Sequence, residues 1–102
     1  MDRSCVIELV KESREKDEYG IDRTTRTSRQ VFAQVDNVTR AEFFEGGRNG
    51  LNPQYVFRVF FGDYDEEREL VYQGKNYGIY RVYQARTDLM ELYAERKGGL
   101  NG

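Results

Sequence analysis

Apolar and polar residues alternate along most of this chain, and a period of two is the pattern of a β-strand with one buried face. In residues 5–11, the side chains of Cys5, Ile7 and Leu9 would form the core face of a first strand. The highly charged residues 12–20 that follow predict an exposed hairpin tip or loop. Threonines and alternating valines then predict a second strand over about residues 27–38.

A third long strand is predicted over residues 54–64, which are apolar on almost both faces. We expect this strand to be central, with its second face covered by a neighbouring subunit or by a short helix. An acidic turn over residues 63–69 leads to a hairpin of residues 69–73 and 76–84. Within that hairpin, strict alternation places on one face Tyr77, Ile79, Arg81 and Tyr83.

Residues 85–87 turn the chain into a last strand over residues 88–95, where the composition also suits a short helix. Residues 97–102 have the composition of a frayed tail. The whole pattern predicts one domain over residues 1–102 with an all-β fold. The expected architecture is a small antiparallel β-barrel or sandwich of about six strands, with one short helix or long loop between the second and third long strands.

Residues 39–53 interrupt the strand pattern with a helix-start signature. Thr39 can accept a hydrogen bond from the backbone N–H of Glu42, and the Glu42 side chain can reach back to the N–H of Thr39. Gly46 and Gly47 predict that the helix ends after about two turns. A helix this short is not stable alone, so its order must come from the barrel or from a neighbouring subunit. The segment is either a simple crossover connection or a working surface.

The residues that usually carry catalysis are scarce. The 102-residue chain contains no histidine, the commonest general base and metal ligand, and a single cysteine, Cys5, expected to be an inert thiol in an apolar run. The glycine-rich residues 46–50 lack the lysine of a phosphate loop. The carboxylates of residues 63–69 lack the glycine and the distal glutamate of a calcium loop. We therefore expect no enzymatic activity, no metal and no cofactor.

The charge and hydropathy of the chain argue against two classes of partner. A net charge of −2 gives the molecule as a whole no electrostatic attraction to nucleic acid or anionic lipid. No apolar stretch approaches membrane-spanning length, and the first residues lack the apolar run of a secretion signal. We expect a soluble protein that is made in a cytoplasm and has no membrane partner.

One local basic patch and one row of aromatic residues leave an alternative open. Arg23, Arg26 and Arg29 could contact phosphate, although pairing with the acidic residues of segment 12–22 is the simpler interpretation. Stacking of bases is conceivable for a tyrosine-rich hairpin that contains Tyr72, Tyr77, Tyr80 and Tyr83. The alternative function is therefore a small nucleic-acid-binding β-barrel that uses this hairpin and this patch.

Across nearly its whole length the chain resembles the head-tail joining proteins of tailed bacteriophages, also called head closure or stopper proteins. The resemblance lies in the order and spacing of a series of segments, since no single motif is diagnostic. These segments are Val6-Ile7-Glu8-Leu9-Val10, Asp17-Glu18-Tyr19-Gly20, Val31-Phe32-Ala33-Gln34-Val35, Val38-Thr39-Arg40-Ala41-Glu42-Phe43-Phe44, Leu51-Asn52-Pro53 with the strand that follows, Gly74-Lys75-Asn76-Tyr77-Gly78-Ile79-Tyr80-Arg81-Val82-Tyr83, and Leu89-Met90-Glu91-Leu92-Tyr93.

The resemblance implies a structural virion protein of the head-tail connector, assembled in the cytoplasm of a host bacterium. It implies a ring of copies of the chain, twelvefold in the family, between a portal or adaptor protein above and a tail-terminator or tail completion protein below. Such a ring closes the channel behind packaged DNA without binding a specific sequence, and it docks the tail. The connection that would form the channel loop or an inter-subunit clasp is residues 40–52, with Arg40, Glu42, Phe43, Phe44, Arg48, Asn49, Leu51 and Asn52.

A closed ring needs two different complementary faces on each subunit. Two patches of opposite charge fit such a seam and would fix its register. The predicted ring-interface charge pair sets Arg23, Arg26 and Arg29 against Asp65, Glu66 and Glu67.

Overall fold

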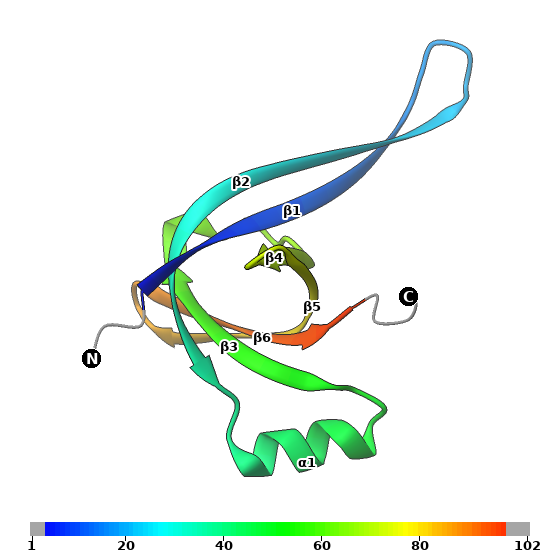
Figure 1. Ribbon diagram of the computed structural model, residues 1–102. Coiled ribbons are helices and arrows are strands. Elements are labelled where there is room, and N and C mark those ends of the chain that lie inside the picture. The colour runs from blue at the N-terminus through cyan, green and yellow to red at the C-terminus, as the bar shows by residue number, and fades with distance from the viewer. Residues whose placement is uncertain (1–3, 98–102) are drawn as a thin grey trace.

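The computed structural model describes residues 4–97, in which six antiparallel strands close into a barrel (Figure 1). The strands follow one another around the barrel in the order β1-β2-β3-β6-β5-β4, and residues Glu8–Val10 of β1 pair with β4 to close it. The elements are β1 (Ser4–Lys16), β2 (Asp22–Asn37), α1 (Arg40–Arg48), β3 (Pro53–Phe60), a 3-10 turn η1 (Phe61–Asp63), β4 (Glu69–Tyr72), β5 (Lys75–Arg86) and β6 (Leu89–Arg96). The predicted all-β barrel with one short helix between the second and third long strands is confirmed.

Aromatic rings fill much of the small core. Phe57 is fully buried, and its ring meets the ring of Tyr72 edge to face at 5.2 Å between centroids. Tyr55 and Tyr77 complete this group of four rings. Aliphatic side chains from the alternating positions of the strands surround it, including Ile7 and Leu9 of the predicted core face. Large rings bury more area than aliphatic side chains do, which suits a chain that is only 38% hydrophobic.

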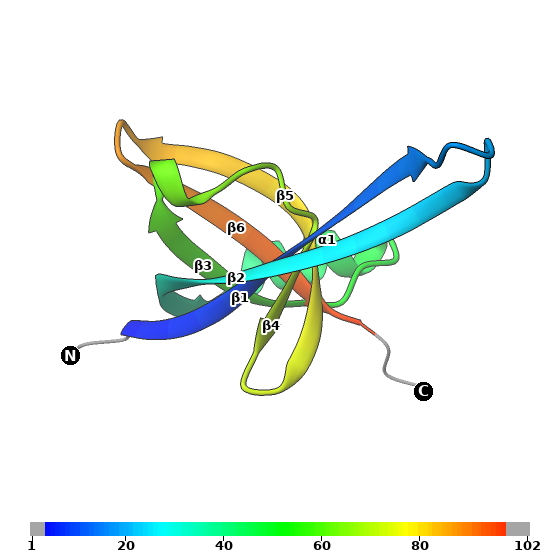
Figure 2. The same cartoon turned by 90° about the horizontal axis from the view of Figure 1, so that it is seen from above.

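The β1–β2 hairpin is much longer than the sequence predicted. Residues 12–16, expected in a hairpin tip or loop, continue β1, and β2 begins at Asp22 rather than near residue 27. The two strands pair without a break from Ser4 with Gln34 to Lys16 with Asp22. Their outer part, residues 12–26, leaves the barrel as a twisted two-stranded ribbon, which we call the arm (Figures 1 and 2). The predicted exposed hairpin tip is confirmed for residues 17–20, but residues 12–16 are strand, because β-pairing requires only backbone groups, which charged side chains leave free.

The remaining strands shift by a few residues from their predicted bounds. The third long strand ends at Phe60, four residues early, because residues 61–63 form η1. The strand β5 begins at Lys75 and runs to Arg86, so the predicted turn at residues 85–87 moves to Thr87 and Asp88. Residues 89–96 are a strand and not a short helix. Of the predicted tail, residues 98–102 lie outside the described residues.

An irregularity in β5 overturns one prediction about side-chain facing. Ile79 lies opposite the buried Ala94, whereas Arg81 lies opposite Tyr93, and the pairing register shifts between these two pairs. Residues directly opposite each other in a sheet share a face. Tyr93 is one residue from Ala94 and therefore faces outward. Arg81 accordingly lies on the outer face with Tyr93, and not on the inner face with Ile79 as strict alternation predicted.

Candidate assembly surface

The helix α1 begins as its sequence predicts, but only half of the predicted capping arrangement forms. Thr39 Oγ1 accepts a hydrogen bond from the backbone N–H of Glu42 at 3.1 Å, and the backbone O of Thr39 accepts from Phe43 at 2.9 Å. The carboxylate of Glu42 does not return to the N–H of Thr39; it reaches across to the barrel instead. A charged group gains more from partners in a partly buried site than from an exposed backbone N–H.

The end of the helix differs from the prediction. Gly46 and Gly47 lie within α1, and Asn49 is its C-terminal cap. The backbone O of Gly46 accepts hydrogen bonds from Asn49 at 3.0 Å and from Leu51 at 2.9 Å, and Gly50 takes the left-handed conformation with φ +79°. Gly46 is buried because the ring of Pro53 occupies the space that a Cβ would need. A glycine is therefore required at position 46 for close packing against Pro53 and not for ending the helix.

Glu42 anchors α1 to the outer face of the barrel. Its carboxylate accepts a hydrogen bond from the hydroxyl of Tyr80 at 2.7 Å and forms an ion pair with the guanidinium of Arg81. The Arg81 guanidinium also lies over the ring of Tyr93, 4.7 Å from its centroid. Burial, with the hydrogen bond to Glu42 second, raises the pKa of Tyr80. The shift in register between Ile79 and Arg81 is what turns Arg81 towards the helix.

The helix α1 also presents two adjacent aromatic rings to solvent. Phe43 is 46% exposed and Phe44 is 61% exposed, and their rings meet edge to face at 5.8 Å. A shallow groove beside them is lined by Val38, Thr39 and Pro53 among others. Two large apolar side chains held side by side on an ordered helix form a surface suited to protein contact.

The other predicted residues of segment 40–52 divide between solvent and structural roles. Arg40 is exposed, and Arg48 makes only a loose ion pair with Glu45 at 3.8 Å. Asn49 donates through Nδ2 to the backbone O of Glu45 at 3.1 Å. Leu51 is half-buried against Gly46, and the backbone N–H of Asn52 donates to the carboxylate of Glu95 at 3.1 Å. Both ends of the segment are thus tied to the barrel.

The three arginines of the predicted seam are paired within the chain. Arg23 contacts Asp17 at 3.2 Å, and Arg26 lies 3.9 Å from Glu12, as the simpler interpretation of the basic patch expected. Arg29 finds its partner outside the acidic segment 12–22: it forms an ion pair with the buried Glu67 at 3.0 Å.

The acidic side of the predicted seam is only partly free. Lys11 binds Asp65 at 2.9 Å and lowers its pKa. Glu66 is exposed, and among the described residues no ion pair involves it. Of the opposite-charge contacts expected between subunits, the one between Arg29 and Glu67 therefore already exists within one chain.

Most of the predicted tyrosine ladder is packed inside the molecule. Tyr72 and Tyr77 belong to the core group of rings, and Tyr80 is half-buried with its hydroxyl bound to Glu42. Of the four rings, only that of Tyr83 is mainly exposed. Tyr83 is therefore the only one of these four tyrosines whose ring is accessible for base stacking.

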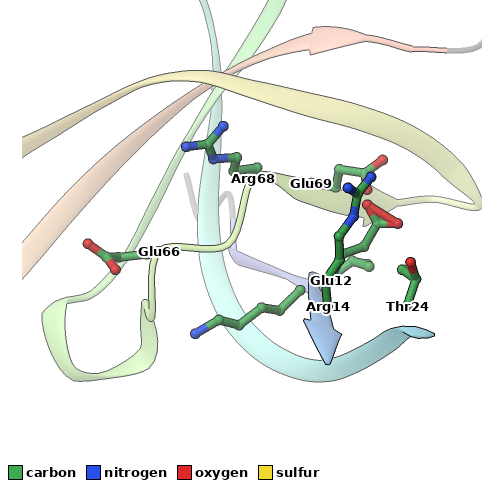
Figure 3. A pocket seen from close by; sticks show the side chains of 8 residues that line it. Glu12, Arg14, Thr24, Glu66, Arg68 and Glu69 are labelled. Carbon is green, nitrogen blue, oxygen red and sulfur yellow. The ribbon is translucent and has the colours of Figure 1, made fainter. Parts of the chain in front are cut away.

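A polar pocket of about 440 Å³ lies at the root of the arm (Figure 3). Glu12 and Arg14 enter it from β1, Thr24 from β2, Arg68 from the connection before β4, and Glu69 from the start of β4. Its basic residues Lys11, Arg14 and Arg68 are matched by the acidic Glu12, Glu66 and Glu69. A balanced lining gives the pocket no preference for an anion or a cation.

Two features of the site were missed in the sequence. Tyr80 and Arg81 hold the helix in place, but a bulge that has no local sequence signal turns them towards it. Four exposed apolar residues, Val6, Tyr19, Ile21 and Phe32, lie on the β1–β2 hairpin. The alternation did place Val6 on the outer face, and an apolar residue at an outward position is the signal that could have found this group.

Comparison with protein-family models finds no family that matches this chain, and comparison with curated proteins finds no similar protein. Within residues 4–97, no group of three or more potential ligand side chains could hold a metal ion. Over the same residues, no helix has both the length and the apolar character that crossing a bilayer requires.

Proposed function

We propose that this protein is a structural virion protein of a bacteriophage head-tail connector. Copies of the chain form a ring below the portal or adaptor protein, close the DNA channel after packaging, and dock the tail-terminator or tail completion protein. The resemblance of the segment order to head-tail joining proteins suggests this role, and the form of segment 40–52 supports it.

The single observation that carries the proposal is the exposed pair of Phe43 and Phe44 on an anchored helix. A simple crossover would not need α1 to be fastened by Glu42 at one end and by the packing of Gly46 on Pro53 at the other. This double attachment fixes the direction in which the two rings point. A rigid apolar surface loses little entropy when it binds, which favours a defined protein–protein contact.

The contact is one between proteins and not with the packaged DNA. The only described basic residues on α1 and its preceding cap are Arg40 and Arg48, and they are accompanied by Glu42 and Glu45. A balanced surface has no strong attraction for phosphate, so DNA can move past it. Neighbouring copies of the chain and the proteins above and below the ring are the partners that an apolar pair would contact.

The test uses DNA-filled capsids and tails of the phage that encodes the chain, with particles that lack this protein. Purified protein is added, followed by tails, and infectious particles are counted. Wild-type protein is expected to restore infectivity, and Phe43→Ala/Phe44→Ala is expected to lower the yield at least 100-fold. Alanine keeps the helix propensity, so circular dichroism of this variant should remain that of the wild type.

Tyr83→Ala is the matched control, because Tyr83 is as exposed as Phe44 but belongs to β5 and not to α1. It should restore infectivity as well as the wild type does. Full restoration by Phe43→Ala/Phe44→Ala, or no restoration by the wild type, would overturn the proposed function.

A further inference from the structure

Two exposed apolar surfaces lie at opposite ends of the β1–β2 ribbon. At the tip, Tyr19 is 79% exposed and Ile21 is also mainly exposed. At the base, Val6 and Phe32 are direct cross-strand partners on the outer face of the barrel, and Phe32 is 79% exposed. An exposed tyrosine or phenylalanine alone is ordinary, but paired apolar side chains at both ends of one hairpin are not.

The tip is a turn fixed by hydrogen bonds, and its two apolar side chains are exposed. One carboxylate oxygen of Asp17 accepts hydrogen bonds from the backbone N–H groups of Tyr19 and Ile21, each at 2.9 Å. The other oxygen binds Arg23 at 3.2 Å, and Gly20 supplies a left-handed residue with φ +77°. These hydrogen bonds, that of Ile21 foremost, lower the pKa of Asp17. Tyr19 and Ile21 are therefore presented by an ordered turn.

The base of the ribbon has a hollow large enough for an apolar side chain of the tip. Val6, Gln30, Val31 and Phe32 line a hollow of about 180 Å³ on the outer side of the ribbon. This volume accommodates one large apolar side chain. Gln30 is the only lining residue with a polar side chain, so the hollow favours an apolar occupant.

The arm between these ends lacks stabilisation of its own. Every residue from 12 to 30 except Asp17 is exposed, so neither face of the ribbon is covered. Its cross-strand pairs are polar, as in Ser13 with Thr25 and Arg14 with Thr24. A two-stranded hairpin without an apolar face is marginally stable in water, and exposed ion pairs add little. An ordered arm of this kind is consistent with a partner that covers it.

The partner cannot be the same molecule. The tip and the base lie at the two ends of one continuous ribbon, which extends away from the barrel in both views (Figures 1 and 2). From Phe32 to Ile21 the strand spans eleven residues, or roughly 36 Å at about 3.3 Å per residue. That reach exceeds the two shorter dimensions of the molecule, 31 and 24 Å, so the tip can reach the barrel of an adjacent copy.

We propose that the arm tip of one copy, through Tyr19 and Ile21, docks on the Val6–Phe32 surface of the next copy. The contact is heterologous, since each chain supplies a tip on one side and a base on the other, and such contacts form a ring when the rotation between neighbouring copies closes. The inference rests on the proposed function, because the ring of copies is the assembly that this contact would build.

The size of the contact explains why a ring is required. One tyrosine and one isoleucine bury roughly 300 Å² of side-chain surface, well below the roughly 800 Å² per partner of a stable complex. A single contact therefore makes only a weak pair of chains. In a closed ring every chain makes the contact twice, and the contact that closes the ring is intramolecular.

Disulfide trapping between two different chains tests the contact. All chains carry Cys5→Ser. One chain carries Glu18→Cys beside the tip, and a second carries Gln30→Cys at the hollow; both substitutions leave the four apolar side chains intact. The chains are mixed at about millimolar concentration under mild oxidation. A chain with Gln84→Cys, an exposed glutamine on β5, replaces the Gln30→Cys chain as the control.

We expect at least tenfold more mixed dimer with Gln30→Cys than with Gln84→Cys. Adding Tyr19→Ser to the tip chain should reduce the mixed dimer to the control level. Equal trapping at both positions, no trapping, or trapping that is insensitive to Tyr19→Ser would overturn the proposal.

The infectivity assay of the proposed function separates the two possible failures. If wild-type protein restores infectivity but no tip-to-hollow dimer forms, the connector role stands and the arm contact is wrong. If the dimer forms but infectivity is not restored, the arm contact stands and the connector role is wrong.

Discussion

Arg29 of β2 and the buried Glu67 form an ion pair at the root of the arm, 3.0 Å apart, that joins two segments distant in the sequence. Glu67 is 2% exposed, and its second carboxylate oxygen accepts the backbone N–H of Asp65 at 2.7 Å. The Arg29 guanidinium also donates to the backbone O of Asp63. The pair therefore fastens the connection between β3 and β4 to β2 at the point where the ribbon leaves the barrel.

Arg29→Ala should lower the free energy of unfolding by about 1–3 kcal/mol. The substitution leaves the buried Glu67 carboxylate with only its backbone partner, and an unpaired buried acceptor is costly. Urea unfolding followed by circular dichroism measures the change.

Arg26→Ala is the control for this substitution. Arg26 lies 3.9 Å from Glu12 and 3.7 Å from Glu69 at the exposed surface, so its removal should cost less than about 1 kcal/mol. An equal loss of stability in Arg29→Ala and Arg26→Ala would show that the burial of Glu67 does not determine the destabilisation.

Glu42→Ala should release α1 from the barrel while the barrel stays folded. The substitution removes the acceptor of the Tyr80 hydroxyl and the ion pair with Arg81, and such charge-assisted hydrogen bonds contribute about 1.5–3 kcal/mol. Amide hydrogen exchange in residues 40–48 should accelerate at least tenfold, with little change in the core of β3. Glu45→Ala removes only a loose pair with Arg48 and should leave the exchange unchanged.

Gly46→Ala and Gly47→Ala should change stability in opposite directions. A Cβ at Gly46 would collide with the ring of Pro53, so this variant should lose about 1–3 kcal/mol. A Cβ at Gly47 meets nothing within 4 Å, and alanine in a helix is favoured over glycine by about 0.5–1 kcal/mol. Thermal unfolding of the two variants measures this difference, and a loss at both positions would contradict the packing explanation.

The attachment of α1 to the barrel should weaken at alkaline pH, when Tyr80 ionises. Burial and the Glu42 hydrogen bond raise the pKa of Tyr80 above its ordinary value of 10.0. A raised pKa means that the folded state favours the neutral phenol. The resulting stabilisation is complete below pH 10 and disappears as the pH rises through the folded-state pKa.

Ring carbon NMR of labelled tyrosines resolves this titration. In the wild type, the Tyr80 signal should titrate above pH 10, together with the loss of exchange protection in α1. Glu42→Gln removes the neighbouring charge and should move the midpoint downward while burial keeps it raised. An unchanged midpoint would show that Glu42 does not influence Tyr80.

The sequence predicted those features that depend on short-range periodicity. The inward positions of Ile7 and Leu9 follow from alternation alone, because one buried face imposes a period of two. Thr39 was identified as a helix cap because capping involves residues only three positions apart. The helix in segment 40–52 was located because it interrupts the strand pattern; its Phe43 and Phe44 are exposed, and its role as an assembly surface stays a prediction.

The predictions that failed depend on partners that the local sequence pattern does not place. The local sequence favours a Glu42 side chain that caps its own helix. The fold instead brings Tyr80 and Arg81 within reach of its carboxylate. Gly46 has the signature of a helix end, yet the position of Pro53 makes it a packing contact. The position of the bulge before Arg81 depends on how β5 pairs with β6.

By itself, the sequence determined the strand class, the core face of the first strand and the location of the single helix, because these depend on local hydrophobic spacing. Only the tertiary structure decided the closure of the barrel, the length of the arm and the anchor of α1. Charged residues 12–16 form a strand because residues 22–26 pair with their backbone. Backbone pairing between distant segments leaves no periodic trace in the side chains, and the folded chain alone reveals it.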